Sequence, residues 1–290
     1  MIVVIVWQVG FDCKIFVVEP AYIRQNLEMK SSVEVVNDQK SQKAGAAGYL
    51  ETILRRFKNI SFAAFIMPIA ALYVICLGTA FLPGVLIVGR ILEATAGESL
   101  LYKSFCLSLG LGAGFLTFVF TLILVVPLVN LPIRPFVKPF RGAWYSFEAV
   151  PWFYHNALFY LVRYTVLNLF TPSPINQFFL RAMGMKIGKN ALVNTANISD
   201  PCLIEVGDYV TLGGSVYMMA HYGMKGFLIV DRLKIEKGAN IGLHSYLMGA
   251  VEVGEFATVL PNSMVLPKTK IAPYTRFGRM DGPLESTGNE

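Results

Sequence analysis

The sequence predicts a parallel β-helix that follows a pair of membrane-spanning helices. The first observation is an aliphatic residue at every sixth position of one C-terminal stretch: Ile235, Ile241, Leu247, Val253, Val259, Val265 and Ile271. A helix repeats every 3.6 residues and a strand every two, so neither explains a period of six. This period is typical of an all-β solenoid whose triangular coils have three six-residue sides. The second observation is a pair of long uncharged runs at residues 60–88 and 104–133.

The six-residue period also occurs earlier in the chain, in a different register. Val206, Leu212 and Met218 keep this spacing, and so do Ile187 and Val193. Glycine follows several of these positions, where we expect corners with unusual φ and ψ angles. Sixteen residues, 219–234, separate the two registers and contain His221. We therefore expect one loop to interrupt the solenoid.

Three segments have the residue choice of a known superfamily: Met185–Asn190 (MKIGKN), Ile204–Asp208 (IEVGD) and Lys234–Gly242 (KIEKGANIG). Over residues 185–276 the chain resembles the hexapeptide-repeat acyltransferases. That resemblance implies a left-handed β-helix, acyl transfer from an acyl-CoA or acyl-carrier thioester, and a homotrimer with sites between subunits. A wider arrangement, including Phe178–Gly184, resembles the membrane-bound C-terminal region of certain peptide synthetases.

The two uncharged runs are each long enough to cross a bilayer. A hydrocarbon core about 30 Å thick needs roughly 20 apolar residues in a helix. A buried helical hairpin of a soluble protein is the alternative, but core helices rarely reach this length. The composition, 54% hydrophobic and 15% charged, is too apolar for an ordinary soluble protein. The net charge of +6 fits an anionic membrane surface, and no aromatic–basic motif indicates nucleic acid.

Basic residues predict which side of the membrane the termini face. Six lie outside the pair of runs and two lie between them: Arg55, Arg56, Lys58, Arg134, Lys138 and Arg141 against Arg90 and Lys103. The positive-inside rule then places both termini and the β-helix in the cytoplasm, and the spans in the inner membrane if the protein is bacterial.

These patterns divide the chain into five parts: an N-terminal cytoplasmic, flexible segment (1–58), a two-span transmembrane hairpin (59–135), an aromatic interfacial helical segment (136–180), the β-helix (181–278) and a disordered tail (279–290). Trp and Tyr prefer the headgroup level, which favours an interfacial helix in the third part. A third span over residues 150–169 is the alternative. The first residues lack the features of a signal peptide, and a start at Met29 is an alternative to Met1.

His221 is the candidate catalytic base. The resemblance implies that a histidine at the base of such a loop removes a proton from an acceptor hydroxyl or amine, and a near-neutral pKa suits this role. Asp231, in the same loop, is our preferred residue to orient it, with Glu205 and Asp208 as alternatives. We expect the loop base to be solvent-accessible. A structural histidine that packs the loop is the other interpretation.

Other residues could complete the site. In a trimer, His244 of one subunit could approach His221 of the next. Four residues are candidates for binding the donor thioester: Lys237, Lys268 and Lys270 for its phosphates, and Gly242 for its carbonyl oxygen. A solvated face of the solenoid explains these lysines equally well. We expect His155 to be an interfacial polar group, and we expect no metal, since the known three-histidine site of this fold has a different spacing.

The sequence therefore predicts a membrane-anchored acyltransferase. It would move an acyl group, such as acetyl, from a thioester to a hydroxyl or amine of an envelope-related or lipid-linked acceptor, with no bound cofactor. The alternative is a non-catalytic trimerisation and docking module on a membrane anchor. Acyl-CoA or an acyl carrier, the acceptor and membrane lipids are the expected partners.

Overall fold

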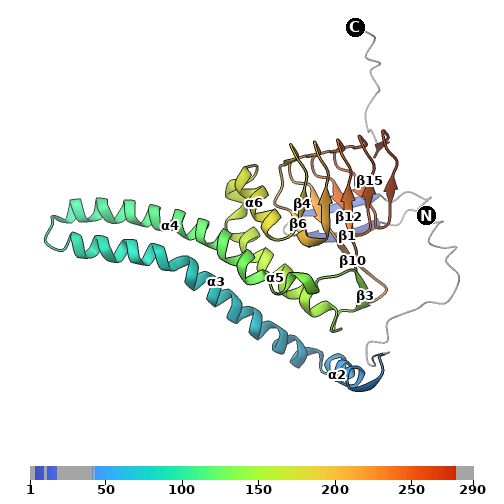
Figure 1. Cartoon of the computed structure of the whole chain (residues 1–290), viewed down its shortest axis with the longest axis horizontal. Coiled ribbons are helices and arrows are strands. Elements are labelled where there is room, and N and C mark those ends of the chain that lie inside the picture. Colours follow the sequence, from blue (N-terminus) through green and yellow to red (C-terminus); the bar gives the residue numbers. More distant parts are fainter. Residues whose placement is uncertain (1–3, 10–11, 18–40, 42, 279–290) are drawn as a thin grey trace, which may run out of the picture. The chain divides into compact units, whose positions relative to one another are not determined.

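The computed structural model describes residues 4–9, 12–17, 41 and 43–278 of the chain. The chain divides into two compact units, residues 1–35 and 36–290. In the first unit, strands β1 (Val4–Val9) and β2 (Asp12–Val17) pair antiparallel. The second unit contains all the other elements (Figure 1). The expected flexible segment thus contains β1, β2 and helix α2 (Gly45–Arg56), while residues 18–40 with Met29, and the tail 279–290, lie outside the described residues.

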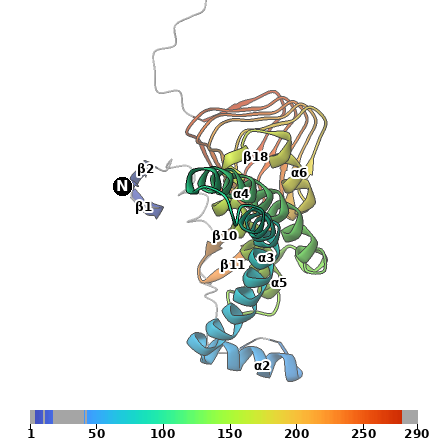
Figure 2. The same cartoon turned by 90° about the vertical axis from the view of Figure 1, so that its left-hand side faces the viewer.

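Two long apolar helices, α3 (Lys58–Ala94) and α4 (Leu100–Asn130), pack side by side and antiparallel (Figures 1 and 2). Their backbones meet at two glycines, where a Cβ on Gly84 would lie 3.1 Å from the Cα of Gly114. A pair of stacked rings, Phe81 and Phe118, with centroids 4.4 Å apart, continues this contact. By length and composition both helices could cross a membrane, and no other helix in the described residues could.

The aromatic segment after α4 folds against the rest of the protein. It contains η1 (Arg134–Phe136), strand β3 (Phe140–Ala143), helix α5 (Ala149–Thr165), η2 (Leu167–Phe170) and helix α6 (Pro174–Ala182). On α5, the side chains of Trp152, His155, Phe159 and Val162 are buried, at the 3–4 residue spacing of one helix face. These side chains pack inside the protein, whereas Trp144, Phe147 and Tyr164 of the same segment are exposed. The interfacial placement of the segment as a whole stays a prediction.

The C-terminal region is a parallel β-helix with three sheets. One sheet contains β4 (Lys186–Ile187), β7 (Ile204–Val206), β12 (Leu233–Ile235), β15 (Glu252–Val253) and β18 (Lys270–Ile271). The next contains β5 (Leu192–Val193), β8 (Thr211–Leu212), β13 (Asn240–Ile241), β16 (Thr258–Val259) and β19 (Arg276–Phe277). The third contains β6 (Ile198–Ser199), β9 (Tyr217–Met219), β14 (Tyr246–Leu247) and β17 (Met264–Val265).

The six-residue period is confirmed as the core of this β-helix. Lys234 pairs with Glu252 and Glu252 with Lys270, so successive coils differ by 18 residues. All seven aliphatic residues of the period, from Ile235 to Ile271, are buried. Their burial in a continuous stack is the main stabilising contribution, at about 25 cal/mol per Å² of apolar surface.

The glycines that follow the aliphatic positions have a different role from the one we expected. The left-handed corner conformation is taken by other residues, including His244 (φ 55°) and Lys268 (φ 65°). Gly242 instead lies where the next coil passes closely, since a Cβ there would be 2.4 Å from the backbone nitrogen of Pro261. Glycine is required at this position by close packing rather than by backbone angle.

Helix α6 closes the N-terminal end of the β-helix. Ser173 caps this helix by accepting from the backbone N–H of Ile175 at 3.2 Å. The amide nitrogen of Asn176, which is fully buried, donates to the backbone oxygens of Val193 and Thr195. Gln177 donates to the oxygen of Ala191 at 3.0 Å. The first coil is thereby joined to the helices that precede it.

The interrupting loop is a β-hairpin. Strands β10 (His221–Met224) and β11 (Phe227–Val230) pair antiparallel, and β11 also pairs with β3. The guanidinium of Arg141 on β3 lies over the ring of Phe227, 4.2 Å from its centroid. The hairpin that begins at His221 is therefore hydrogen-bonded to the segment that leaves α4.

Candidate active site

The side chain of His221 contacts a buried carboxylate from the preceding coil. Strand β9 stacks on β6, with Ser199 paired to Met219, so the residues that follow these strands lie next to each other. Asp200 adopts a left-handed conformation (φ 59°), which ends β6 and turns its carboxylate toward His221. The Nδ1 atom of His221 lies 2.6 Å from Oδ2 of Asp200. The stacking of coils thus builds a histidine–aspartate pair.

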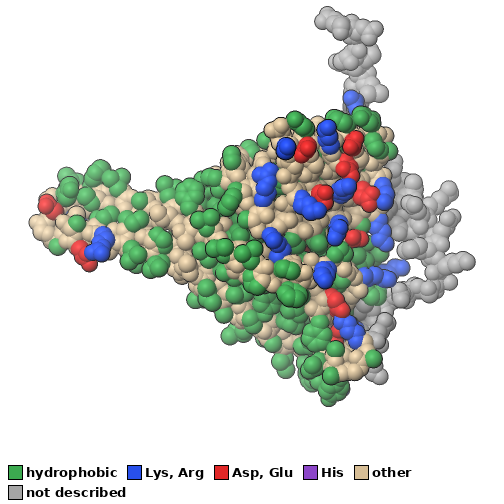
Figure 3. Space-filling view, viewed as in Figure 1, with side chains coloured by type: hydrophobic (Ala, Val, Ile, Leu, Met, Phe, Trp, Pro, Cys, Tyr) green, Lys and Arg blue, Asp and Glu red, His purple; other side chains and the backbone are tan. Residues whose placement is uncertain are grey.

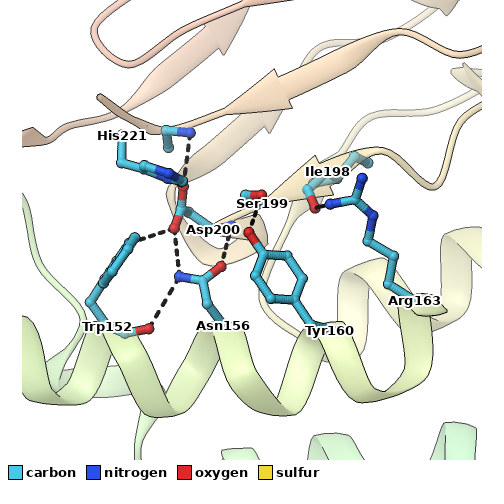
Figure 4. A network of polar contacts seen from close by, with 9 residues as sticks. Trp152, Asn156, Tyr160, Arg163, Ile198, Ser199, Asp200 and His221 are labelled. Atoms are coloured by element: carbon cyan, nitrogen blue, oxygen red, sulfur yellow. Dashed lines mark hydrogen bonds and ion pairs between the residues drawn. The ribbon is translucent and has the colours of Figure 1, made fainter. Parts of the chain in front are cut away.

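The Asp200 carboxylate accepts four hydrogen bonds, although its residue is fully buried. Trp152 Nε1 and Asn156 Nδ2 donate to Oδ1 at 2.5 and 2.6 Å (Figure 4). Ala220 N donates to Oδ2 at 3.0 Å, beside His221. Burial would raise the pKa of Asp200, but the imidazole of His221 and these hydrogen bonds hold it below the ordinary value. Asp200 is therefore an anion with every lone pair in use.

One face of α5 supports this pair. Trp152, Asn156, Tyr160 and Arg163 follow each other at spacings of four, four and three, which aligns them along the helix (Figure 4). The hydroxyl of Tyr160 lies 2.7 Å from that of Ser199. Arg163 donates to the backbone oxygen of Ile198 at 3.2 Å. The helix thus holds both Asp200 and the strand that precedes it.

The environment of His221 suits a general base. Burial lowers its pKa, but Asp200 raises it more, so the pKa lies above the ordinary value. Asp200 accepts the Nδ1 proton, which leaves the lone pair of the neutral imidazole on Nε2. Among the described residues only Nδ1 of His221, and not Nε2, has a side-chain hydrogen bond. The Trp152 ring meets the imidazole edge-on, with centroids 5.0 Å apart.

Two expectations about His221 are wrong. The loop base is not freely accessible, because only 18% of the His221 side chain is exposed. Its partner is not Asp231, whose carboxylate accepts from the backbone N–H of Arg232 at 2.7 Å. The alternatives are also engaged elsewhere, Glu205 with Lys186 and Asp208 with the backbone N–H of Lys189.

The sequence analysis proposed Asp231, Glu205 and Asp208 and missed Asp200. The residues brought together by a β-helix lie one coil apart, and here 21 positions separate the partners. A usable signal was present in the sequence. Asp200 comes directly after strand β6, which contains Ile198, and Ala220 and His221 come directly after the strand β9 that stacks on it, which contains Met218.

His244 lies at the corner between β13 and β14, exposed to solvent, where its backbone N–H donates to the Gly214 oxygen at 3.0 Å. Because β14 stacks on β9, His244 and His221 lie at opposite ends of one side of the triangular coil. Within one chain they do not form a single site.

The candidate donor-binding residues are not brought together. Lys237 lies at the corner after β12, Lys268 at the corner before β18, and Gly242 after β13. Lys270 pairs with Glu252 at 2.9 Å on the outer face of the first sheet. The backbone N–H of Gly242 donates to the oxygen of Val259, so it is not available to a thioester oxygen. The oxyanion role expected for Gly242 is therefore wrong.

Lys237 does line a hollow of about 560 Å³ over the first coils, which also includes Arg181 and Lys186. Its carboxylates Glu205, Asp208 and Glu236 balance these cations. His221 is not among the residues that line it. The hollow and the histidine–aspartate pair are therefore separate features.

His155 is buried rather than interfacial. Its Nδ1 lies 3.0 Å from Oδ1 of Asn130, and burial lowers its pKa to about 4. It is therefore neutral near pH 7. Among the described residues no group of three or more His, Cys, Asp or Glu side chains could hold a metal ion.

No family model matches the chain, and no curated protein sequence matches it. Several solved structures are similar. A hexapeptide-repeat acetyltransferase from Vibrio cholerae is 17% identical, with 42% of this chain and 84% of that chain covered and a TM-score of 0.36. A galactoside acetyltransferase in complex with coenzyme A is 18% identical (42% and 74% covered, TM-score 0.34). The serine acetyltransferase of Neisseria gonorrhoeae is 14% identical (67% and 87% covered, TM-score 0.30). These values describe a likeness and assign no activity to this chain.

Proposed function

We propose that the protein is a membrane-anchored acyltransferase whose general base is His221, oriented by Asp200. The observation that carries the proposal is the 2.6 Å contact between His221 Nδ1 and a fully buried carboxylate, which directs the Nε2 lone pair away from Asp200. A positioned histidine of this kind contributes about 10²–10⁴-fold to a proton-transfer step. The reaction class, and a left-handed course for the coils, follow from the resemblance of the three segments in residues 185–242 to hexapeptide-repeat acyltransferases.

The pair supports direct acyl transfer. Nε2 of His221 takes the proton from the acceptor hydroxyl or amine as that atom attacks the thioester carbonyl carbon. The resulting tetrahedral intermediate collapses, the carbon–sulfur bond breaks, and the imidazolium returns the proton to the leaving thiolate. Asp200 remains ionised throughout and stabilises the imidazolium, which agrees with its lowered pKa. The products are an ester or amide and a free thiol.

Trimerisation is supported by the contrast between two faces of the β-helix. The first sheet carries an outward ladder of alternating charge from Lys186 to Lys270. Figure 3 shows basic and acidic side chains intermingled over the β-helix. The sheet of β9 and β14 is different, because Tyr217 and Tyr246 stack on its outer surface with centroids 4.7 Å apart. Packing of this apolar face around a threefold axis would place His244 of one subunit nearer to His221 of the next. Lys237 and Lys268 remain candidates for the donor phosphates.

A lipid-linked acceptor is supported by the connection between the site and the membrane helices. Hydrophobic side chains cover α3 and α4, and charged ones gather at the turn between them (Figure 3). Strand β3 follows α4 closely and pairs with the hairpin that begins at His221. An acceptor with its chains in the bilayer could therefore reach Nε2. The basic flanks favour a cytoplasmic β-helix.

The test is thiol release from acetyl-CoA by the detergent-purified protein, with and without membrane lipid extract, compared with His221→Asn. We expect acceptor-dependent release by the natural chain, matched by acylated lipid, and almost none by the variant. Equal background release by both proteins with every acceptor would favour the non-catalytic trimerisation and docking module.

A further inference from the structure

We propose that the groove between α4 and α6 binds an alkyl chain of a bilayer lipid. The groove has a volume of about 330 Å³ and an entirely apolar lining: Phe120, Ile123 and Leu124 from α4, with Pro174, Ile175 and Phe178 from α6. The inference rests on the proposed membrane insertion of α3 and α4 and does not depend on acyl transfer.

The depth of the groove along α4 favours an alkyl chain. The uncharged part of this helix begins after Lys103. At about 1.5 Å per residue, Phe120 lies about 26 Å and Leu124 about 32 Å further along the axis. A hydrocarbon core is about 30 Å thick, so the groove lies at its boundary on the side of the β-helix. Lipid chains, rather than water, reach this depth.

Contacts with neighbouring elements hold the two walls of the groove in place. Asn176 and the fully buried Phe179 fix α6 to the β-helix and to α5, where Phe179 stacks on Phe159 with centroids 5.7 Å apart. On the other wall the Phe120 ring lies 5.9 Å from that of Phe170. The two helices therefore do not close the gap, and Phe120 and Phe178 remain 45% and 50% exposed.

The experiment uses the full chain in vesicles that contain a phospholipid with a diazirine on one acyl chain. After irradiation, cross-linked peptides are mapped in the natural chain, in Ile175→Trp, which fills the groove, and in Leu111→Trp. Leu111 is 63% exposed on α4 and does not line the groove, so this variant adds the same side chain elsewhere.

We expect labelling concentrated in residues 120–124 and 174–178 of the natural chain and of Leu111→Trp, and lost in Ile175→Trp. Uniform labelling along α3 and α4 that is unchanged in Ile175→Trp would mean that the helices contact only ordinary surrounding lipid. A protein–protein cross-link at the groove would mean that a second copy of the protein occupies it. Either result overturns the proposal. Release of the protein from the vesicles by alkaline carbonate would overturn the proposal together with the membrane anchor. A lack of acyl-transfer activity would leave the labelling pattern unaffected.

Discussion

Replacement of Asp200 by asparagine should weaken both stability and proton transfer. Each carboxylate oxygen accepts two hydrogen bonds, so either orientation of the new amide turns an N–H₂ group toward two donors. A buried donor without a partner costs about 1–3 kcal/mol, and a lost charge-assisted bond about 1.5–3 kcal/mol. Removal of a buried charge offsets part of this cost. We expect a net loss of about 2–4 kcal/mol in the free energy of unfolding.

The pH dependence of this loss follows from the two pKa shifts. Asp200 has a lowered pKa, so its contribution is present above its ordinary value of 3.8 and is lost as the pH falls through the folded-state value. His221 has a raised pKa, so its contribution is full below 6.5 and is lost as the pH rises through the folded-state value. The natural chain should therefore exceed the variant in stability most clearly between about pH 4 and 6.5.

The assay is denaturant unfolding of the full chain in detergent at several pH values, together with the pH dependence of kcat/KM. Asp231→Asn is the matched control, because its side-chain oxygen can still accept from the N–H of Arg232 and its change in stability should stay within about 0.5 kcal/mol. Asp200→Asn should also lower kcat/KM, because Asp200 no longer raises the pKa of the His221 base. An equal effect of the two substitutions would refute the assignment of Asp200.

Three other predictions concern the supporting structure. His155→Leu should lower the free energy of unfolding by about 1–3 kcal/mol, because buried Asn130 loses its hydrogen bond. The same variant should leave kcat unchanged, and melting and rate measurements check the two expectations. Gly84→Val should destabilise the helix pair by about 1–3 kcal/mol in a detergent unfolding titration, whereas Gly78→Val, with no atom within 4 Å of its Cβ, should not. A reporter fused to the C-terminus should be cytoplasmic and one inserted at Gly97 should lie on the opposite side; the reverse result would contradict the topology.

The sequence predicted the elements whose signal is periodic. Ile235 to Ile271 form the interior of the β-helix because a six-residue side buries one aliphatic residue at a fixed place. The helices α3 and α4 were predicted from the length of the two uncharged runs alone. It did not predict the hairpin of β10 and β11, because the break in the six-residue period was interpreted as a loop and the pairing strand β3 lies far away in the sequence.

Contacts between distant segments limited the prediction of the site. Trp152 and His155 were interpreted as interfacial because an aromatic helix looks alike at a membrane surface and in a protein core. Asp200 was missed because stacking of coils, rather than closeness in sequence, brings it to His221. Gly242 was given a catalytic role, whereas its N–H is part of the ladder between coils.

Acyl transfer by His221→Asn tests the central claim most directly. The asparagine Nδ2 can take the place of imidazole Nδ1 and donate to Asp200, so the buried carboxylate keeps its partner while the base is lost. We predict that kcat/KM falls by about 10²–10⁴-fold with little change in KM for the donor, in a protein that unfolds at nearly the same denaturant concentration as the natural chain. Undiminished transfer by a folded His221→Asn protein would contradict the role of His221 as the base.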